Sequence, residues 1–179
     1  PLMKNGRQFT LGGQIKDNMF WTLASGVTIW TIYEVLMFWA LANGYAPILT
    51  WAAHPVWFVM MFLLIPIWES FYFYWIHRFL HIPFLYKHVH ALHHRNINVG
   101  PWSGLSMHPV EHVIFLGSVM IHWIIAAHPV HILFHLQYYA LTAATTHTGF
   151  EGVAVKDENR LALGRFHHQM HHRYFECRR

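Results

Sequence analysis

Histidines occur in three clusters whose spacing suits metal binding. His77 and His81 are four residues apart, and the segments 90–94 and 168–172 each hold three histidines at positions i, i+3 and i+4. Residues three and four apart lie on one face of a helix, so each cluster can direct its rings at one point. Neutral imidazole is a good ligand for first-row transition metals. The clusters therefore predict a histidine-rich metal site.

The composition indicates that these clusters belong to a membrane protein. Of the 179 residues, 55% are hydrophobic and only 11% are charged, far below the quarter that is usual in soluble domains. This composition excludes a disordered chain and a soluble nucleic-acid-binding protein, so no nucleic-acid partner is expected. The single cysteine, Cys177, excludes a disulfide framework and a cysteine-rich zinc site. We expect one integral membrane domain over residues 1–179 that contacts the lipid bilayer.

Long uncharged stretches predict the elements that position the clusters. A helix needs about 20 apolar residues to cross a bilayer, so the uncharged stretch over 112–150 suits two crossings joined by a turn at 127–129. Glycine and proline at 43–47 separate the two crossings before it. The expected fold class is all-α, a four-helix transmembrane bundle. The predicted transmembrane helices are 18–42, 55–77, 110–127 and 129–147.

The basic residues predict which end of the bundle faces the cytoplasm. All 12 lysines and arginines lie in the segments 1–17, 78–109 and 148–179. The turn between the first two predicted helices and the turn between the last two contain none. Under the positive-inside rule these three segments are cytoplasmic. This orientation brings the three clusters and His147 to the cytoplasmic face of a multi-pass protein, in a bacterial inner membrane or the endoplasmic reticulum.

The number of histidines on this face favours two metal ions. Nine imidazoles exceed what one metal can hold, so we expect two metals with four or five ligands each. A catalytic metal also keeps one position open for water or oxygen. The candidate ligands are His77, His81, His90, His93, His94, His147, His168, His171 and His172.

Two carboxylates are candidate catalytic residues. Glu111 and Glu151 lie near the cytoplasmic ends of their helices, where a carboxylate can accept the ring N–H of a ligating histidine and fix its tautomer. Each could instead be a capping or solvated group, and Glu151 could bind a metal directly. Glu69 precedes His77 by eight residues, about 12 Å deeper in the helix. There it would orient a substrate or pair with a buried polar group.

The remaining histidines are not assigned to the site. His131 precedes His147 by 16 residues, about 24 Å along a straight helix, so His131 and His135 are expected near the opposite face. The outer interface or helix packing is expected for His54, His122 and His128. No role is assigned to His88, His108, His112 and His167.

The ordered clusters, together with segments 107–112 and 147–151, resemble the histidine boxes of the sterol desaturase/fatty acid hydroxylase superfamily over about residues 70–176. The resemblance implies an integral membrane di-iron oxidase that uses O₂ and reducing equivalents to hydroxylate or desaturate a lipid of sterol or fatty acyl type. It implies two Fe ions held by the nine histidines above. The protein as isolated could contain zinc instead.

Two expectations concern the rest of such an enzyme. The sequence shows no cytochrome domain, so a separate electron donor is expected, either cytochrome b5-like or ferredoxin-like. The chain also ends shortly after the last histidine box, at Arg179. Members of the superfamily usually continue beyond this box, so the sequence is expected to be a fragment.

Two other functions are compatible with the same residues. In a zinc-dependent membrane hydrolase, Glu111 or Glu151 would act as general base on a metal-bound water. In a non-catalytic haem- or metal-binding membrane protein, His122, His131 or His135 would be the important residues. Metal content and O₂ consumption distinguish the hydrolase from the oxidase, and a haem absorption band would identify the second alternative.

Overall fold

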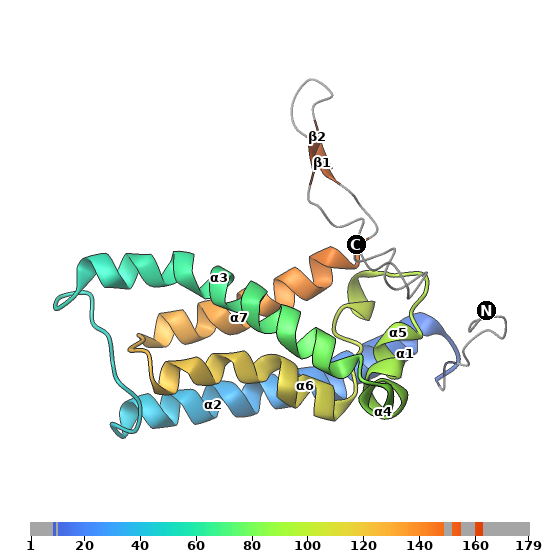
Figure 1. Cartoon of the computed structure of the whole chain (residues 1–179), viewed down its shortest axis with the longest axis horizontal. Coiled ribbons are helices and arrows are strands. Elements are labelled where there is room, and N and C mark those ends of the chain that lie inside the picture. The colour runs from blue at the N-terminus through green and yellow to red at the C-terminus, as the bar shows by residue number, and fades with distance from the viewer. Residues whose placement is uncertain (1–8, 10, 149–151, 155–159, 163–179) are drawn as a thin grey trace.

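The computed structural model describes residues 9, 11–148, 152–154 and 160–162. This part of the chain is helical except for one short hairpin (Figure 1). Strand β1 (Gly152–Ala154) pairs antiparallel with β2 (Arg160–Ala162), with Val153 opposite Leu161. The sequence predicted no strands, because segments of three residues are too short to show an alternating apolar pattern.

The first long helix begins earlier than predicted and changes its winding. Its parts are α1 (Gln14–Trp21), the π-helical segment η1 (Thr22–Val27) and α2 (Thr28–Ala42). The predicted start at residue 18 took Asp17 as a boundary, but Asp17 is fully buried within the helix and paired with Arg95. After the last turn, Gly44 adopts a φ of +73°, which glycine tolerates without steric cost.

Three helices begin at a proline that follows a histidine. They are α3 (Pro55–Leu80), α6 (Pro109–Leu116) and α7 (Pro129–Thr146). Proline suits the first helical position because its fixed φ is helical and the N–H that it lacks would have no helical acceptor. Nδ1 of His108 and of His128 each accepts the backbone N–H two residues later, at 3.2 Å. These two histidines therefore cap α6 and α7.

The third long segment is not a continuous α-helix. The prediction of one helix over 110–127 is replaced by α6 followed by a 3₁₀ helix, η4 (Gly117–Trp123). Side chains of neighbouring helices donate to its carbonyl groups: Tyr33 to Val113, Tyr72 to Ile114 and Trp68 to Ser118, at 2.9, 2.6 and 3.1 Å. A 3₁₀ helix rises about 2.0 Å per residue against 1.5 Å in an α-helix, so α6 and η4 together extend about 26 Å.

The long helical segments of the described chain lie side by side (Figure 1). Helix α2 packs against α6, η4 and α7, and α3 packs against α6 and α7. Met37, Phe115 and Leu136 belong to the main buried cluster between them. The predicted breaks at 43–47 and 127–129 are both present, and a short bridge from Ile48 to Ala127 joins the two turns. The segment 81–108 lies at the other end.

Two helices in the described part of the chain are long and apolar enough to cross a membrane: Gln14–Ala42 and α3. Only 22% and 17% of the residues in their most apolar stretches are buried inside the protein. A core helix of a soluble protein would bury these side chains, because large exposed apolar surfaces are unfavourable in water. The exposed apolar surface is therefore that of a membrane protein.

Candidate metal centre

A short helical run after α3 carries the second histidine cluster. It consists of α4 (Pro83–Leu85), the π-helical η2 (Tyr86–His90) and α5 (Ala91–His94). Helix α3 itself extends to Leu80, three residues beyond the predicted end, so His77 lies in its last turn and His81 directly follows it. Both parts of the site thus sit on helical backbone, which limits the positions of their rings.

Helix α1 holds this run from the other side. The Arg95 guanidinium forms an ion pair with the buried Asp17 carboxylate. Nε2 of Gln14 donates to Oδ1 of Asn96 at 3.1 Å and to the Asn98 carbonyl at 2.6 Å. These contacts join residues about 80 positions apart, so the first helix fixes the segment that follows the histidines.

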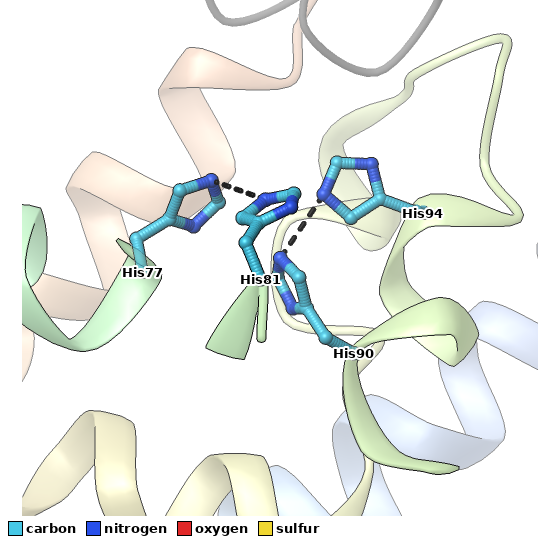
Figure 2. A group of neighbouring side chains, drawn as sticks. All are labelled: His77, His81, His90 and His94. Atoms are coloured by element: carbon cyan, nitrogen blue, oxygen red, sulfur yellow. Dashed lines mark hydrogen bonds between the residues drawn. The ribbon is translucent and has the colours of Figure 1, made fainter. Parts of the chain in front are cut away.

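Four imidazoles converge in the described structure. One potential ligand atom from each of His77, His81, His90 and His94 lies within 4.8 Å of the others (Figure 2). His90 and His94 are buried, and His77 and His81 are half-buried. Two come from the end of α3 and two from the following run, so the first two clusters form a single group.

The geometry of this group fits a metal ion. Nε2 of His77 and Nε2 of His81 are 3.2 Å apart, and the Nε2 atoms of His90 and His94 are 3.0 Å apart. Two nitrogens that each lie about 2.1 Å from one ion, at tetrahedral or octahedral angles, are about 3.0–3.4 Å apart. The donor set is also suitable, because imidazole binds iron and zinc.

Glu111 orients one of these rings. Its Oε1 atom lies 2.7 Å from Nδ1 of His90, and both residues are buried. The Nδ1–H group of His90 donates a hydrogen bond to the carboxyl oxygen of Glu111. The lone pair of the ring is then on Nε2, the atom that faces His94. Glu111 is therefore a positioning residue in this geometry, and its predicted catalytic role stays a prediction.

His93 and His147 form a second pair beside the four. Their ring centroids are 5.1 Å apart, and the His93 ring lies 5.5 Å from that of His90. His147 donates its Nδ1 proton to the Ala143 carbonyl at 2.7 Å, so its lone pair is on Nε2. A neutral imidazole is the form that binds metals.

The other predicted site residues cannot be placed. Six of the nine candidate ligands lie in the described part of the chain, and the structure brings all six into one neighbourhood. Glu151 and the third cluster, His168, His171 and His172, lie outside the described residues, as does His167.

Several histidines that are not assigned to the site have structural partners. His112 donates from Nε2 to the Leu105 carbonyl at 3.1 Å and contacts Ser25 Oγ through Nδ1. His131 donates from Nε2 to the Phe58 carbonyl at 3.0 Å. His122 and His135 contact one another, Nε2 to Nδ1, at 3.0 Å. These contacts hold helices together and involve none of the six grouped rings.

A cavity of about 120 Å³ opens beside the second histidine pair. It lies between α3 and α7, and its surface is mostly apolar. His93 and His147 line it, as do Phe73, Phe115 and Glu69. A cavity of this kind can hold part of an apolar molecule next to the histidines.

This cavity, and the close approach of Gly104 to α7 in its wall, were not predicted from the sequence. A Cβ added at Gly104 would lie 2.2 Å from the Ala143 carbonyl oxygen, so only glycine lets this backbone approach α7. Gly104 and Tyr139 both line the cavity. The sequence signals are weak, because one glycine in a loop and one tyrosine in an apolar helix are common in any membrane protein.

Comparisons with known proteins match one family model and several curated relatives. The family model described as fatty acid hydroxylase matches residues 62–178. A Delta(7)-sterol 5(6)-desaturase of Gibberella zeae is 28% identical over 123 residues, which are 68% of this chain and 38% of that protein. Methylsterol monooxygenase 2-1 of Arabidopsis thaliana is 33% identical over 89 residues, 50% of this chain and 30% of that protein.

Two further facts limit the comparison. The chain spans less than half the length of these curated relatives. The search of solved structures found no match.

Proposed function

Because the chain belongs to the sterol desaturase/fatty acid hydroxylase superfamily, we propose that it hydroxylates or desaturates a lipid of sterol or fatty acyl type. The observation that carries this proposal is the group of four imidazoles from α3 and the run after it. A second observation supports it, because an apolar cavity borders the adjacent pair His93 and His147. Together they are a metal-binding group and a space for an apolar substrate.

The proposed cofactor is a pair of iron ions. His77, His81, His90 and His94 would hold one ion, because they already converge. His93 and His147 would contribute to the second, together with His168, His171 and His172 from the tail. When bound, the irons would supply the O₂-dependent oxidation of an unactivated C–H bond, which side chains alone cannot perform.

The protein's own groups prepare the site for this chemistry. Glu111 and the Ala143 carbonyl fix the tautomers of His90 and His147, so that both rings present Nε2 as an acceptor. The apolar wall formed by Phe73 and Phe115 keeps water from the bound lipid and restricts its orientation. We propose Glu151 as a further carboxylate that orients or binds at this site.

We propose a multi-pass arrangement with the site on the cytoplasmic face. All four long segments would lie in the bilayer, because α6 with η4 extends about 26 Å and α7, with 18 residues, about 27 Å. These lengths are close to the hydrocarbon thickness of about 30 Å. Lys16, Arg78, Lys87 and Arg95 belong to the site end, whereas the turns at 43–54 and 124–128 contain no lysine or arginine.

The co-substrates follow from the proposed reaction. We propose O₂ as the oxidant and a separate electron donor, cytochrome b5-like or ferredoxin-like, that docks on the cytoplasmic side. The host membrane would be a bacterial inner membrane or the endoplasmic reticulum.

Mass spectrometry of membrane lipids tests this function. Cells that express the chain should accumulate a lipid that has gained one oxygen or lost two hydrogens, and this product should require O₂. His94→Ala should abolish the product because it removes one of the four converging rings. His88→Ala is the matched control, since His88 is exposed and contacts Phe84, through its carbonyl and its ring, rather than the grouped imidazoles. Hydrolysed lipids formed without O₂ would contradict the proposal and favour a zinc hydrolase.

A further inference from the structure

The cavity contains two buried polar groups that the proposed metal centre does not use. Glu69 and Tyr139 line its wall, and their exposed fractions are 2% and 3%. Both carboxyl oxygens of Glu69 lack a hydrogen-bond partner among the described residues. The same is true of the Tyr139 hydroxyl. Leaving such groups unsatisfied in a buried site is unfavourable, so a ligand that satisfies both would gain affinity.

The neighbours of Glu69 do not remove this need. Nε2 of His135 lies 3.4 Å from Oε1 of Glu69, but the same atom lies 2.8 Å from Ser118 Oγ. The shorter contact is the hydrogen bond, and it leaves Glu69 with a weak electrostatic contact only. Glu69 therefore faces the cavity as a buried hydrogen-bonding group.

The position of Tyr139 is fixed by packing. Its ring stacks on Phe115, with centroids 3.9 Å apart and an angle of 24° between the rings. Tyr139 lines the cavity from α7 and Glu69 lines it from α3. The cavity thus has one rigid phenol hydroxyl and one carboxyl group in an otherwise mostly apolar wall.

We propose that Glu69 and Tyr139 together bind a hydroxyl group of the lipid that occupies this cavity. A hydroxyl group both donates and accepts, so it can donate to a carboxyl oxygen of Glu69 and accept from the phenol. A fatty acid or phosphate would bring a negative charge into this apolar surrounding, where the loss of its hydration is unfavourable. A pure hydrocarbon would leave both groups unsatisfied.

The helices also set the distance between this anchor and the histidines. Glu69 precedes His77 by eight residues in α3, and Tyr139 precedes His147 by eight residues along α7. Eight residues of α-helix rise about 12 Å. The bound hydroxyl would therefore lie about 12 Å from the metal ligands. This inference rests on the proposed function and makes it more specific, because the reacting carbon would be remote from the hydroxyl group.

Access from the lipid phase is available. Ser70 and Thr142 line the same cavity and are exposed on α3 and α7. The cavity is smaller than a long-chain lipid, so the remainder of the chain would extend out between these two residues.

Direct binding to the purified full chain in lipid nanodiscs tests the anchor without catalysis. The probes are 1-hexadecanol, hexadecane and hexadecanoate, compared at one pH by competition with radiolabelled 1-hexadecanol. We expect the alcohol to bind the wild type at least fivefold more tightly than either other probe. Tyr139→Phe should weaken the alcohol about fivefold and leave hexadecane unchanged.

Glu69→Gln separates recognition from a structural role. It keeps the shape but replaces one carboxyl oxygen by an NH₂ donor, so the affinity for the alcohol should fall about fivefold and the affinity for hexadecane should stay unchanged. A structural defect would weaken all probes together. Matched controls are Glu34→Gln and Tyr45→Phe, which change a carboxyl group bonded to Trp30 and an exposed phenol, both outside the cavity lining.

The outcomes are distinct from those of the lipid-product experiment. Equal binding of alcohol and hydrocarbon, no binding of any probe, or equal effects of the variants on all probes would overturn the anchor. Selective binding that is lost as predicted would support it even if expression yields no oxidised lipid. Failure of the proposed function would then be visible as missing product with the anchor intact.

Discussion

Oε1 of Glu111 lies 2.7 Å from Nδ1 of His90, and both side chains are buried. Glu111 comes from the first turn of α6, whereas His90 belongs to the run that follows α3. The contact therefore ties the group of four imidazoles to α6. It also selects the tautomer in which His90 presents Nε2 to the other rings.

Removal of this carboxylate should weaken metal binding more than it weakens the fold. We expect Glu111→Ala to lower the affinity for iron by about 10–100-fold, because ring-orienting partners of this kind have effects of that size. Glu111→Gln keeps an acceptor oxygen and should lose less. Competitive titration with a chelator measures both. Wild-type affinity in the alanine variant would show that Glu111 does not act through His90.

The ion pair between Asp17 and Arg95 should stabilise the segment behind the histidines. Asp17 is fully buried, so Asp17→Ala leaves the Arg95 charge without its main partner and should cost about 3–5 kcal/mol. The double variant Asp17→Asn with Arg95→Met should recover most of this loss, because no unpaired charge remains. Unfolding in detergent micelles measures each value. A loss below about 1 kcal/mol for Asp17→Ala would contradict the assignment.

Gly104 should tolerate no side chain. In Gly104→Ala the new Cβ would meet the Ala143 carbonyl oxygen at 2.2 Å, so the loop must move from α7. We expect a loss of about 1–3 kcal/mol in stability and weaker lipid binding in the cavity. Gly100→Ala is the control, because nothing lies within 4 Å of its added Cβ. Equal unfolding midpoints for the two variants would argue against the close approach.

His108 should make stability depend on pH. Burial lowers the pKa of His108 below its ordinary value, and Nδ1 accepts the Val110 N–H only when it is unprotonated. The folded state thus favours the neutral ring, so the stability from this cap is present above about pH 6.5 and is lost as the pH falls below it.

His108→Asn tests this cap, because asparagine accepts the same N–H at every pH in this range. The variant should lose up to about 1 kcal/mol less stability than the wild type between pH 7.5 and pH 5. Unfolding midpoints at the two pH values measure the difference. Parallel pH profiles for the two proteins would exclude a role for this cap.

The sequence was sufficient to predict where the helices break. Gly44 follows the end of α2 and Pro129 begins α7, both for local steric reasons, and both breaks are present. The 3₁₀ winding of η4 could not be predicted, since Tyr33, Tyr72 and Trp68 from other helices donate to carbonyl groups at the end of α6 and the start of η4. The predicted start of the first helix was wrong because Asp17 is charged and its partner, Arg95, is distant in the sequence.

The candidate site shows the same division. The spacing of His77 with His81 and of His90 with His94 predicted that each pair would share a helix face, and both pairs converge. The spacing gave no reason to separate His93 from His90 and His94. His93 lies beside His147, the residue that directly follows α7. Glu69 and Tyr139 line one cavity because α3 and α7 pack side by side, and no local pattern in the sequence encodes this packing.

Metal analysis of the chain purified without oxygen tests the central claim most directly. We expect about two iron ions per chain in the wild type, and about one fewer when His90 and His94 are both replaced by alanine. Mössbauer spectra should show nitrogen-rich iron sites. A folded wild-type chain that binds no metal, or a double variant that retains the full iron content, would contradict the claim that the converging imidazoles form a metal centre.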